Sequence, residues 1–158
     1  MSQALIEKFY ASFANGDADG MVSCYHEEVT FTDPAFGTLQ GDRAKAMWRM
    51  LLSNSDTELT VHYFDIEAEG DKGRAQWLAK YFFGLKRRLV INEVSAAFTF
   101  KDGKIFTHVD DFDMWRWSRQ ALGMAGTFMG WSGYMRNKVQ ATTRTRLDKF
   151  MAKGGSVD

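Results

Sequence analysis

Apolar residues at helical spacing open the chain and predict its first helix. Leu5, Phe9 and Phe13 recur at every fourth position, and the Asn-Gly-Asp segment at residues 15–17 ends the pattern. The aspartate of this segment is a suitable N-cap for a short second helix, which we expect to include Tyr25.

Strand-like and helical patterns then alternate. The Val-Thr-Phe-Thr segment at residues 29–32 is β-branched and aromatic, which predicts a short strand, and a turn at residues 33–37 carries the only proline. A third helix is expected from residue 41. Its apolar face consists of Ala44, Met47, Trp48 and Leu51.

From residue 58 the pattern predicts four long strands. They cover residues 58–69, 72–84, 88–101 and 104–113, with tight hairpin turns at 69–73 and 101–104. Helices followed by an antiparallel meander indicate an α+β fold, with the helices on one face of the sheet. Residues 114–133, rich in Met, Trp and Gly, indicate an irregular segment, and a final helix with one apolar and one basic side is expected over 134–151.

The composition is that of one globular domain. The chain has 158 residues, of which 45% are hydrophobic and 15% aromatic, enough for a substantial core or an aromatic pocket. The lone Cys24 cannot form an internal disulfide, and the first residues lack a basic segment followed by an apolar run. No stretch has the roughly 18 apolar residues of a membrane span. We therefore expect a cytoplasmic protein that does not bind membranes.

The net charge of zero gives no overall field toward nucleic acid, so we expect no nucleic-acid partner. The distribution is uneven. Residues 114–158 contain eight basic and two acidic side chains, whereas residues 1–113 contain twelve and eighteen. This asymmetry favours docking of the basic end on the acidic part, within one chain or between two.

Several short segments, in this order of elements, carry a resemblance. They are FYASFANGD at 9–17, DGMV at 19–22, YHEEVTFTDP at 25–34, FTFKDGKI at 98–105 and RQALG at 119–123. Together they resemble the ketosteroid isomerase and SnoaL-like branches of the nuclear transport factor 2-like superfamily. The resemblance implies a cone-shaped, curved antiparallel sheet packed on the N-terminal helices around an apolar pocket, and a homodimer formed through the outer sheet face. It covers residues 1–123 as one α+β barrel domain, with residues 124–158 as a helical extension packing on the same domain or on a dimer partner.

The resemblance also locates possible catalytic groups. Asp33 falls where the ketosteroid isomerases keep their general base. Their oxyanion-hole tyrosine falls at Phe9 and their second oxyanion donor, an aspartate, near Ala96, so neither donor is present. Tyr10 is about 100° further around the helix than Phe9 and is expected to point elsewhere. Steroid isomerase activity is therefore not expected.

Alternation on the last strand places Phe106, His108, Asp110 and Phe112 on one face, which the resemblance makes the pocket face. A histidine and an aspartate two residues apart can share a proton, and an apolar pocket raises the pKa of a carboxylate. We predict that Asp110 and His108 form the acid/base pair and that Asp33 is a second carboxylate at the mouth. The residues expected to line the pocket are Phe9, Phe13, Trp48, Ala96, Phe98, Phe106 and Phe112.

Structural interpretations of the same residues stay open. Asp33 before a proline also suits an Asx-turn, the His108–Asp110 pair could be purely structural, and a bulge in the last strand would exchange its faces. The three histidines are dispersed and no glycine-rich phosphate loop follows a strand, so we expect no metal and no cofactor.

The sequence therefore predicts a cofactor-independent acid/base enzyme, of the isomerase, cyclase, hydratase or epoxide hydrolase type, acting on a small, largely apolar molecule. A non-catalytic binder of such a molecule is the alternative, and the absent donors at Phe9 and Ala96 favour it. A third possibility is a partner-binding module that uses the basic C-terminal helix.

Overall fold

The N-terminal apolar pattern forms three helices. In the computed structural model, which describes residues 2–129 and 132–154, these are α1 (Ser2–Ala14), α2 (Ala18–Ser23) and α3 (Asp42–Ser53). Asp17 caps α2, because its carboxylate accepts a hydrogen bond from the Gly20 backbone N–H at 2.9 Å. The buried face of α1 consists of Ile6, Phe9, Tyr10 and Phe13.

Six strands form one sheet in the order β2-β1-β6-β5-β4-β3. The strands are β1 (Tyr25–Asp33), β2 (Gly37–Gln40), β3 (Thr60–Glu69), β4 (Lys72–Phe83), β5 (Arg88–Lys101) and β6 (Lys104–Asp111). The α+β class is confirmed. The sheet is mixed rather than purely antiparallel, because β1 and β6 run parallel while the other neighbours are antiparallel. The long connection between β1 and β6, which includes α3, allows this parallel pairing.

The four long strands follow the alternation of the sequence, and each lies within two residues of its predicted bounds. Asp102 and Gly103 both have positive φ, 54° and 73°, which matches the two-residue turn expected between β5 and β6. Two features differ from the prediction. Tyr25 begins β1 instead of lying in the second helix, and the short strand β2 follows the turn after Asp33.

The segment expected to be irregular is largely helical. It forms α4 (Met114–Leu122) and α5 (Met124–Met129), and the last helix, α6 (Gly133–Ala152), matches its predicted range closely. Asp113 caps α4 by accepting a hydrogen bond from the Arg116 N–H at 3.0 Å, and Gly123, with a φ of 65°, ends it. The buried face of α4 consists of Met114, Trp117, Ser118 and Ala121, at helical spacing.

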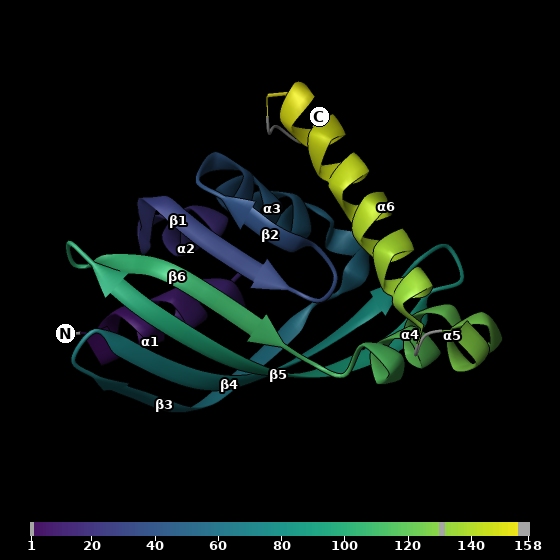
Figure 1. Ribbon diagram of the computed structural model, residues 1–158, viewed down its shortest axis with the longest axis horizontal. Helices are drawn as coiled ribbons and strands as arrows, with labels where there is room; N and C mark the ends of the chain where they lie inside the picture. The colour runs from purple at the N-terminus through teal and green to yellow at the C-terminus, as the bar shows by residue number, and fades with distance from the viewer. Residues whose placement is uncertain (1, 130–131, 155–158) are drawn as a thin grey trace.

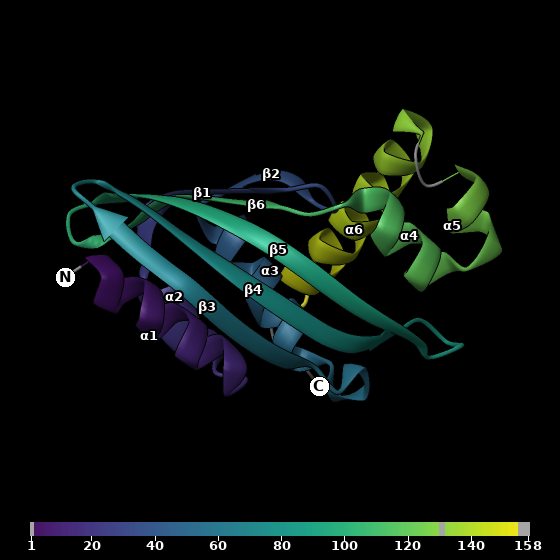
Figure 2. The same cartoon turned by 90° about the horizontal axis from the view of Figure 1, so that it is seen from below.

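The helices lie on one side of the sheet and at one end of it. Figure 1 shows α6 running past β2 and α3, and Figure 2 shows α1 and α2 beneath the strands with α4 and α5 at the far end. The main core cluster joins α1, α3 and the sheet, and a smaller one joins β5 and α4. Tyr81 and Phe112 pack against both clusters. No helix in the described part of the chain is long and apolar enough to cross a membrane.

Candidate functional site

A bulge in β6 decides which of its side chains enter the core. Thr99 pairs with Thr107 but Phe100 pairs with Ile105, so the register shifts at Phe106. Ile105 and His108 are both fully buried as a result.

Phe106 lies outside the core clusters. Its ring packs on the His26 ring at 5.4 Å between centroids and beneath the Lys101 ammonium at 5.0 Å. The prediction that Phe106 shares a face with His108 is therefore wrong, and the bulge is the physical reason.

His108 and Asp110 form a buried hydrogen-bonded pair. Their side chains are side by side on β6, with His108 Nε2 2.8 Å from Asp110 Oδ1, and the two residues are 0% and 3% exposed. The hydroxyl of Tyr25 lies 2.8 Å from His108 Nδ1, and Trp48 Nε1 donates to the same hydroxyl at 2.8 Å. One chain of hydrogen bonds therefore runs from α3 through β1 to β6.

The direction of these hydrogen bonds follows from the donors available. The Trp48 indole can only donate, so the Tyr25 oxygen accepts from it and the Tyr25 O–H is free to donate to His108 Nδ1. Burial raises the pKa of Tyr25 well above its ordinary value, which keeps the phenol protonated. With Nδ1 accepting from Tyr25, Nε2 is the His108 ring nitrogen that donates a hydrogen bond to the Asp110 carboxylate.

Tyr10 also lies close to Asp110, contrary to the prediction that it points elsewhere. Its hydroxyl is buried, with no hydrogen-bond partner in the described part of the chain. Burial and then the charge of Asp110 raise the pKa of Tyr10 well above its usual range. Trp77 Nε1 points at Asp110 Oδ1 from 3.4 Å, a long contact. The site therefore contains a phenol O–H with unused hydrogen-bonding capacity beside a carboxylate.

Aromatic rings surround the His108 imidazole. The rings of Phe98, Phe31, Phe9 and Trp48 have centroids 4.5, 5.0, 5.4 and 6.2 Å from it. The structure thus brings together three of the predicted lining residues, Phe9, Trp48 and Phe98, around His108.

The other predicted lining residues are not among the rings that surround His108. Phe13 packs on Trp48 and Trp77, with centroids 5.1 and 5.2 Å away. Ala96 lies opposite Asp110 in the ladder between β5 and β6, and Phe112 is partly buried between the two core clusters.

Asp33 ends β1 and forms the Asx-turn considered from the sequence. Its Oδ1 accepts a hydrogen bond from the Phe36 N–H at 2.6 Å, which forms the Asx-turn. Burial raises the pKa of Asp33 to about 7, and the nearby Asp110 carboxylate contributes to the rise. A carboxyl group that is about half protonated near neutral pH can both give and take a proton.

Tyr81, on β4, extends the site toward α4. Trp117 Nε1 donates to the Tyr81 hydroxyl at 2.7 Å. Burial raises the pKa of Tyr81 to about 12, and the charge of Asp33 adds to this effect. Asp33 is therefore within electrostatic reach of both Asp110 and the Tyr81 phenol, and Tyr81 packs where the two core clusters meet.

Comparison with known proteins agrees with this architecture. A family model described as a SnoaL-like domain matches residues 6–108, well over half of the chain. The chain belongs to this family. Comparison with the curated proteins found no match.

Solved structures with the same fold accompany the SnoaL-like match, and several are described as NTF2-like. TsrD from Streptomyces laurentii is 25% identical over 78% of this chain and 96% of its own, with a TM-score of 0.65. An LEH-like epoxide hydrolase of M. tuberculosis is 20% identical over 79% and 92%, with a TM-score of 0.63. TerC, crystallised with polyporic acid, is 20% identical over 70% and 89%, with a TM-score of 0.59.

The SnoaL-like match ends at His108, so Asp110 and all three C-terminal helices lie beyond it. Among the residues that the structure describes, no group of three or more His, Cys, Asp or Glu side chains is placed to hold a metal ion.

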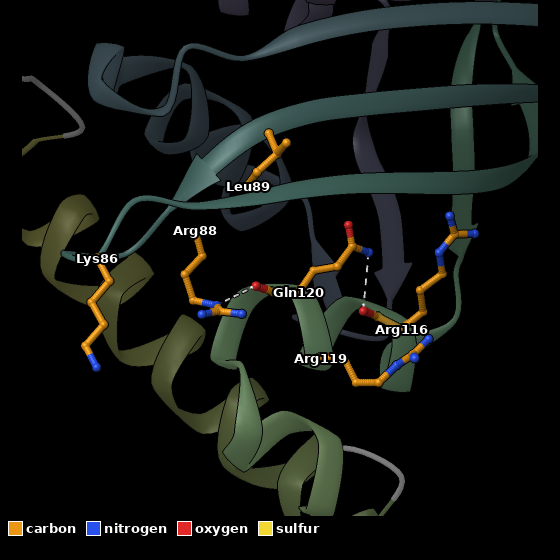
Figure 3. Close-up of a pocket in the computed structure, with 6 residues that line it drawn as sticks. All are labelled: Lys86, Arg88, Leu89, Arg116, Arg119 and Gln120. Atoms are coloured by element: carbon orange, nitrogen blue, oxygen red, sulfur yellow. Dashed lines mark hydrogen bonds between the residues drawn. The ribbon is translucent and has the colours of Figure 1, made fainter.

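Two of the hollows on the described surface are well outlined, and neither has His108 or Asp110 in its lining. One, of about 450 Å³, lies between the start of α2 and the end of α3. The other, of about 610 Å³, lies between the β4–β5 hairpin and α4 and is shown in Figure 3. Its lining residues are Lys86, Arg88, Leu89, Arg116, Arg119 and Gln120.

The lining of the hollow in Figure 3 contains no carboxylate, histidine, cysteine or tyrosine side chain. Its cations spread along the groove, and Arg88 Nε is bound to the Gln120 carbonyl oxygen at 2.8 Å. The apolar pocket expected around His108 remains a prediction.

Proposed function

We propose that this SnoaL-like domain is a cofactor-independent acid/base enzyme that acts on a small, largely apolar molecule. The observation that carries the proposal is the buried Tyr25–His108–Asp110 chain of hydrogen bonds within electrostatic reach of Asp33, whose pKa is raised to about 7. Buried titratable groups with perturbed pKa values are enriched at active sites.

Asp110 is the proposed general base. His108 donates to its Oδ1, and Tyr25 fixes the tautomer of His108, so the carboxylate is held in place. Its Oδ2 is available to take a proton from a carbon next to a carbonyl group or from a water molecule. The aromatic surroundings exclude water, which strengthens the electrostatic interactions in the site.

Asp33 is the proposed partner that delivers or receives the second proton. With a pKa of about 7 it exists in both protonation states near neutral pH, and a charge on Asp110 favours its protonated form. The unpartnered Tyr10 hydroxyl can donate a hydrogen bond to an oxygen that gains negative charge. Tyr10 would then replace the donors that are absent at Phe9 and Ala96.

The apolar molecule is proposed to enter where the two core clusters meet. Asp33, Tyr81 and Phe112 are partly exposed there, while His108 and Asp110 lie deeper. Isomerases, cyclases, hydratases and epoxide hydrolases all need one group to remove a proton and another to deliver one. The structural similarity to an LEH-like epoxide hydrolase is in keeping with this class.

The direct test is a substrate screen with a matched inactive protein. Panels of small cyclic ketones, epoxides and polyketide-like phenols would be incubated in deuterated water with the wild type and with Asp110→Asn. Mass spectrometry would follow product formation and deuterium incorporation. Turnover or exchange by the wild type alone is expected, and turnover by both proteins would rule out Asp110 as the base.

A non-catalytic binder is the second candidate. It is favoured by the packing of His108, whose two ring nitrogens are both hydrogen-bonded and which neither surface hollow borders. A binder returns its ligand unchanged after long incubation, whereas the enzyme does not.

Replacing Asp33 by Asn is expected to change how stability depends on pH. A folded-state pKa of about 7, against an ordinary value of about 4, means that the folded protein holds this proton more tightly than the unfolded chain. This tighter binding of the proton stabilises the folded wild type at low pH, and the wild type loses the stabilisation as pH rises from about 4 to about 7.

Asn has no proton to lose and keeps the acceptor for the Phe36 N–H, so the loss should disappear in Asp33→Asn. The full rise in pKa corresponds to about 4 kcal/mol, and partial exposure of Asp33 screens this to about 2 kcal/mol. Urea unfolding at pH 4 and pH 7.5 measures it, with Asp111→Asn, an exposed neighbour of Asp110, as the control. Parallel pH profiles for Asp33→Asn and the wild type would contradict the raised pKa.

We also propose that the domain forms a homodimer through the outer face of its sheet. Val109 alternates with the inward-facing His108 and Asp110 and is 44% exposed, an apolar side chain on that face. Val109→Glu is expected to weaken dimerisation at least tenfold in analytical ultracentrifugation. Leu85→Glu, at the exposed tip of the β4–β5 hairpin, should leave it unchanged. A wild type that sediments as a monomer at all concentrations would exclude the dimer.

A further inference from the structure

Helix α6 holds the turn that carries Asp33. Three side chains at positions i, i+3 and i+4 of α6 donate hydrogen bonds to three consecutive backbone carbonyl groups of this turn. The contacts are Gln140 Nε2 to the Pro34 oxygen at 3.1 Å, Thr143 Oγ1 to the Ala35 oxygen at 2.8 Å, and Arg144 Nε to the Phe36 oxygen at 2.9 Å. Figure 1 shows α6 passing beside β2, which follows this turn.

Side chains supply several hydrogen bonds of this turn. Pro34 has no N–H, and the Phe36 N–H is bound to Asp33 Oδ1. The Pro34, Ala35 and Phe36 carbonyl groups accept from side chains of α6, and these donors come from outside the region that matches the family model, which ends at residue 108. Asp33 thus accepts a hydrogen bond from the Phe36 N–H of the turn, and the C-terminal extension donates hydrogen bonds to the carbonyl groups of the turn.

Gly37 makes this contact possible. A Cβ atom at this position would lie 2.6 Å from Arg144 Nη2, closer than real atoms approach, and the φ of Gly37 is +71°. The guanidinium group therefore lies directly against the turn backbone. A second contact holds α6 against α3, where Arg43 Nη1 donates to Asp148 Oδ1 at 2.5 Å.

We propose that α6 is a positioning element of the active site, in which Gln140, Thr143 and Arg144 hold the 33–37 turn so that Asp33 stays largely shielded from water and within electrostatic reach of Asp110. The proposal rests on the proposed function, because it assigns a purpose to the placement of Asp33. It gives the C-terminal extension a part in the chemistry without any contact between α6 and the substrate.

The physical link between α6 and Asp33 is burial. Burial is the largest cause of the raised pKa of Asp33, and the backbone N–H of Phe36 acts in the opposite direction. The titratable groups that influence Asp33, or are influenced by it, are Asp110 on β6, Tyr81 on β4 and Tyr25 on β1, and the Arg144 cation is bound to the Phe36 oxygen of the turn. Releasing the turn would let water reach the carboxyl group and lower its pKa.

Thr143→Val tests the proposal with little change in volume, because it removes the hydroxyl that lies 2.8 Å from the Ala35 oxygen of the turn and 3.0 Å from the Gln140 oxygen of its own helix. Thr142→Val is the matched control, since the Thr142 hydroxyl binds the Lys138 carbonyl oxygen of its own helix at 2.9 Å. NMR titration of the Asp33 carboxyl carbon measures its pKa without any substrate. The value is expected to fall from about 7 to about 5 or lower in Thr143→Val. It should stay unchanged in Thr142→Val and in Thr143→Ser, which restores the hydroxyl.

Arg144→Gln provides a second variant, and loss of its contact should move the pKa of Asp33 in the same direction. A purely structural contribution of α6 would lower the melting temperature of these variants but leave the pKa in place. A pKa of Asp33 that stays near 7 in both folded variants would overturn the proposal.

The proposed function fails separately, if the wild type turns over no substrate or if Asp110→Asn is fully active. Either of those results leaves the titration of Asp33 readable, so the two failures are distinguishable.

Discussion

Asp110→Asn is expected to lower kcat on a substrate of this enzyme by about 10²–10⁴-fold, the usual contribution of a general acid or base. Asn retains the shape of the side chain and can still accept the His108 Nε2–H, so the chain of hydrogen bonds from Trp48 through Tyr25 persists. The variant loses only the ability to take a proton. KM should therefore change much less than kcat, because the apolar contacts that bind the molecule remain.

The control for Asp110→Asn is Asp111→Asn, which changes the same residue type one position along β6 on the exposed side of the strand. Circular dichroism and thermal unfolding of both variants separate loss of chemistry from loss of fold. Steady-state kinetics with kcat values within twofold of the wild type for Asp110→Asn would exclude Asp110 as the base.

Local patterns in the sequence were sufficient to predict the four long strands of the sheet. The alternation in residues 58–113 and the turn residues between the strands predicted the bounds of β3, β4, β5 and β6. Such a prediction is possible because the period of a strand and the residues of a hairpin turn depend only on neighbouring residues. The same alternation placed His108 and Asp110 on one face. It failed at Phe106, since a bulge changes the face without a clear local signal.

The helical end of the chain was harder to predict. Tryptophan, methionine and glycine in residues 114–133 suggested irregular structure, although the Asp113 cap and the spacing of Met114, Trp117 and Ala121 were visible in the sequence. Tyr10 was missed in a similar way. It lies at i+4 from Ile6, on the buried face of α1, and that spacing could have identified it as an inward-facing residue.

The hydrogen bonds of the site could not be predicted from local patterns. Tyr25 and His108 are 83 positions apart, and they meet only because β1 pairs in parallel with β6. Gln140, Thr143 and Arg144 meet the Asp33 turn across more than 100 positions. Such contacts depend on the tertiary fold, so the sequence could suggest the carboxylates but not the groups that hold them.

The site combines two demands that conflict. A buried carboxylate lowers stability unless it is paired, and pairing restricts its chemistry. His108 resolves part of this conflict, because its Nε2 donates a hydrogen bond that satisfies Oδ1 of Asp110. Removing His108 should therefore affect stability, whereas removing the charge of Asp110 should mainly affect activity.

His108→Leu is expected to lower the free energy of unfolding by about 3–5 kcal/mol, because it leaves Asp110 buried with only the long Trp77 contact. Leucine fills a similar volume among the surrounding rings, so an unpaired buried charge, rather than a cavity, is the main cause. Chemical unfolding at pH 7 measures the loss.

The double variant His108→Leu/Asp110→Leu separates this cause from simple loss of packing. Replacing both members of a buried pair by apolar side chains is often neutral or stabilising, so the double variant should recover at least half of the stability lost in His108→Leu. The Tyr25 hydroxyl still loses its acceptor in both proteins, which limits the recovery. If the double variant is as unstable as His108→Leu, the destabilisation comes from repacking of the aromatic rings, and Asp110 is not a buried carboxylate that depends on His108.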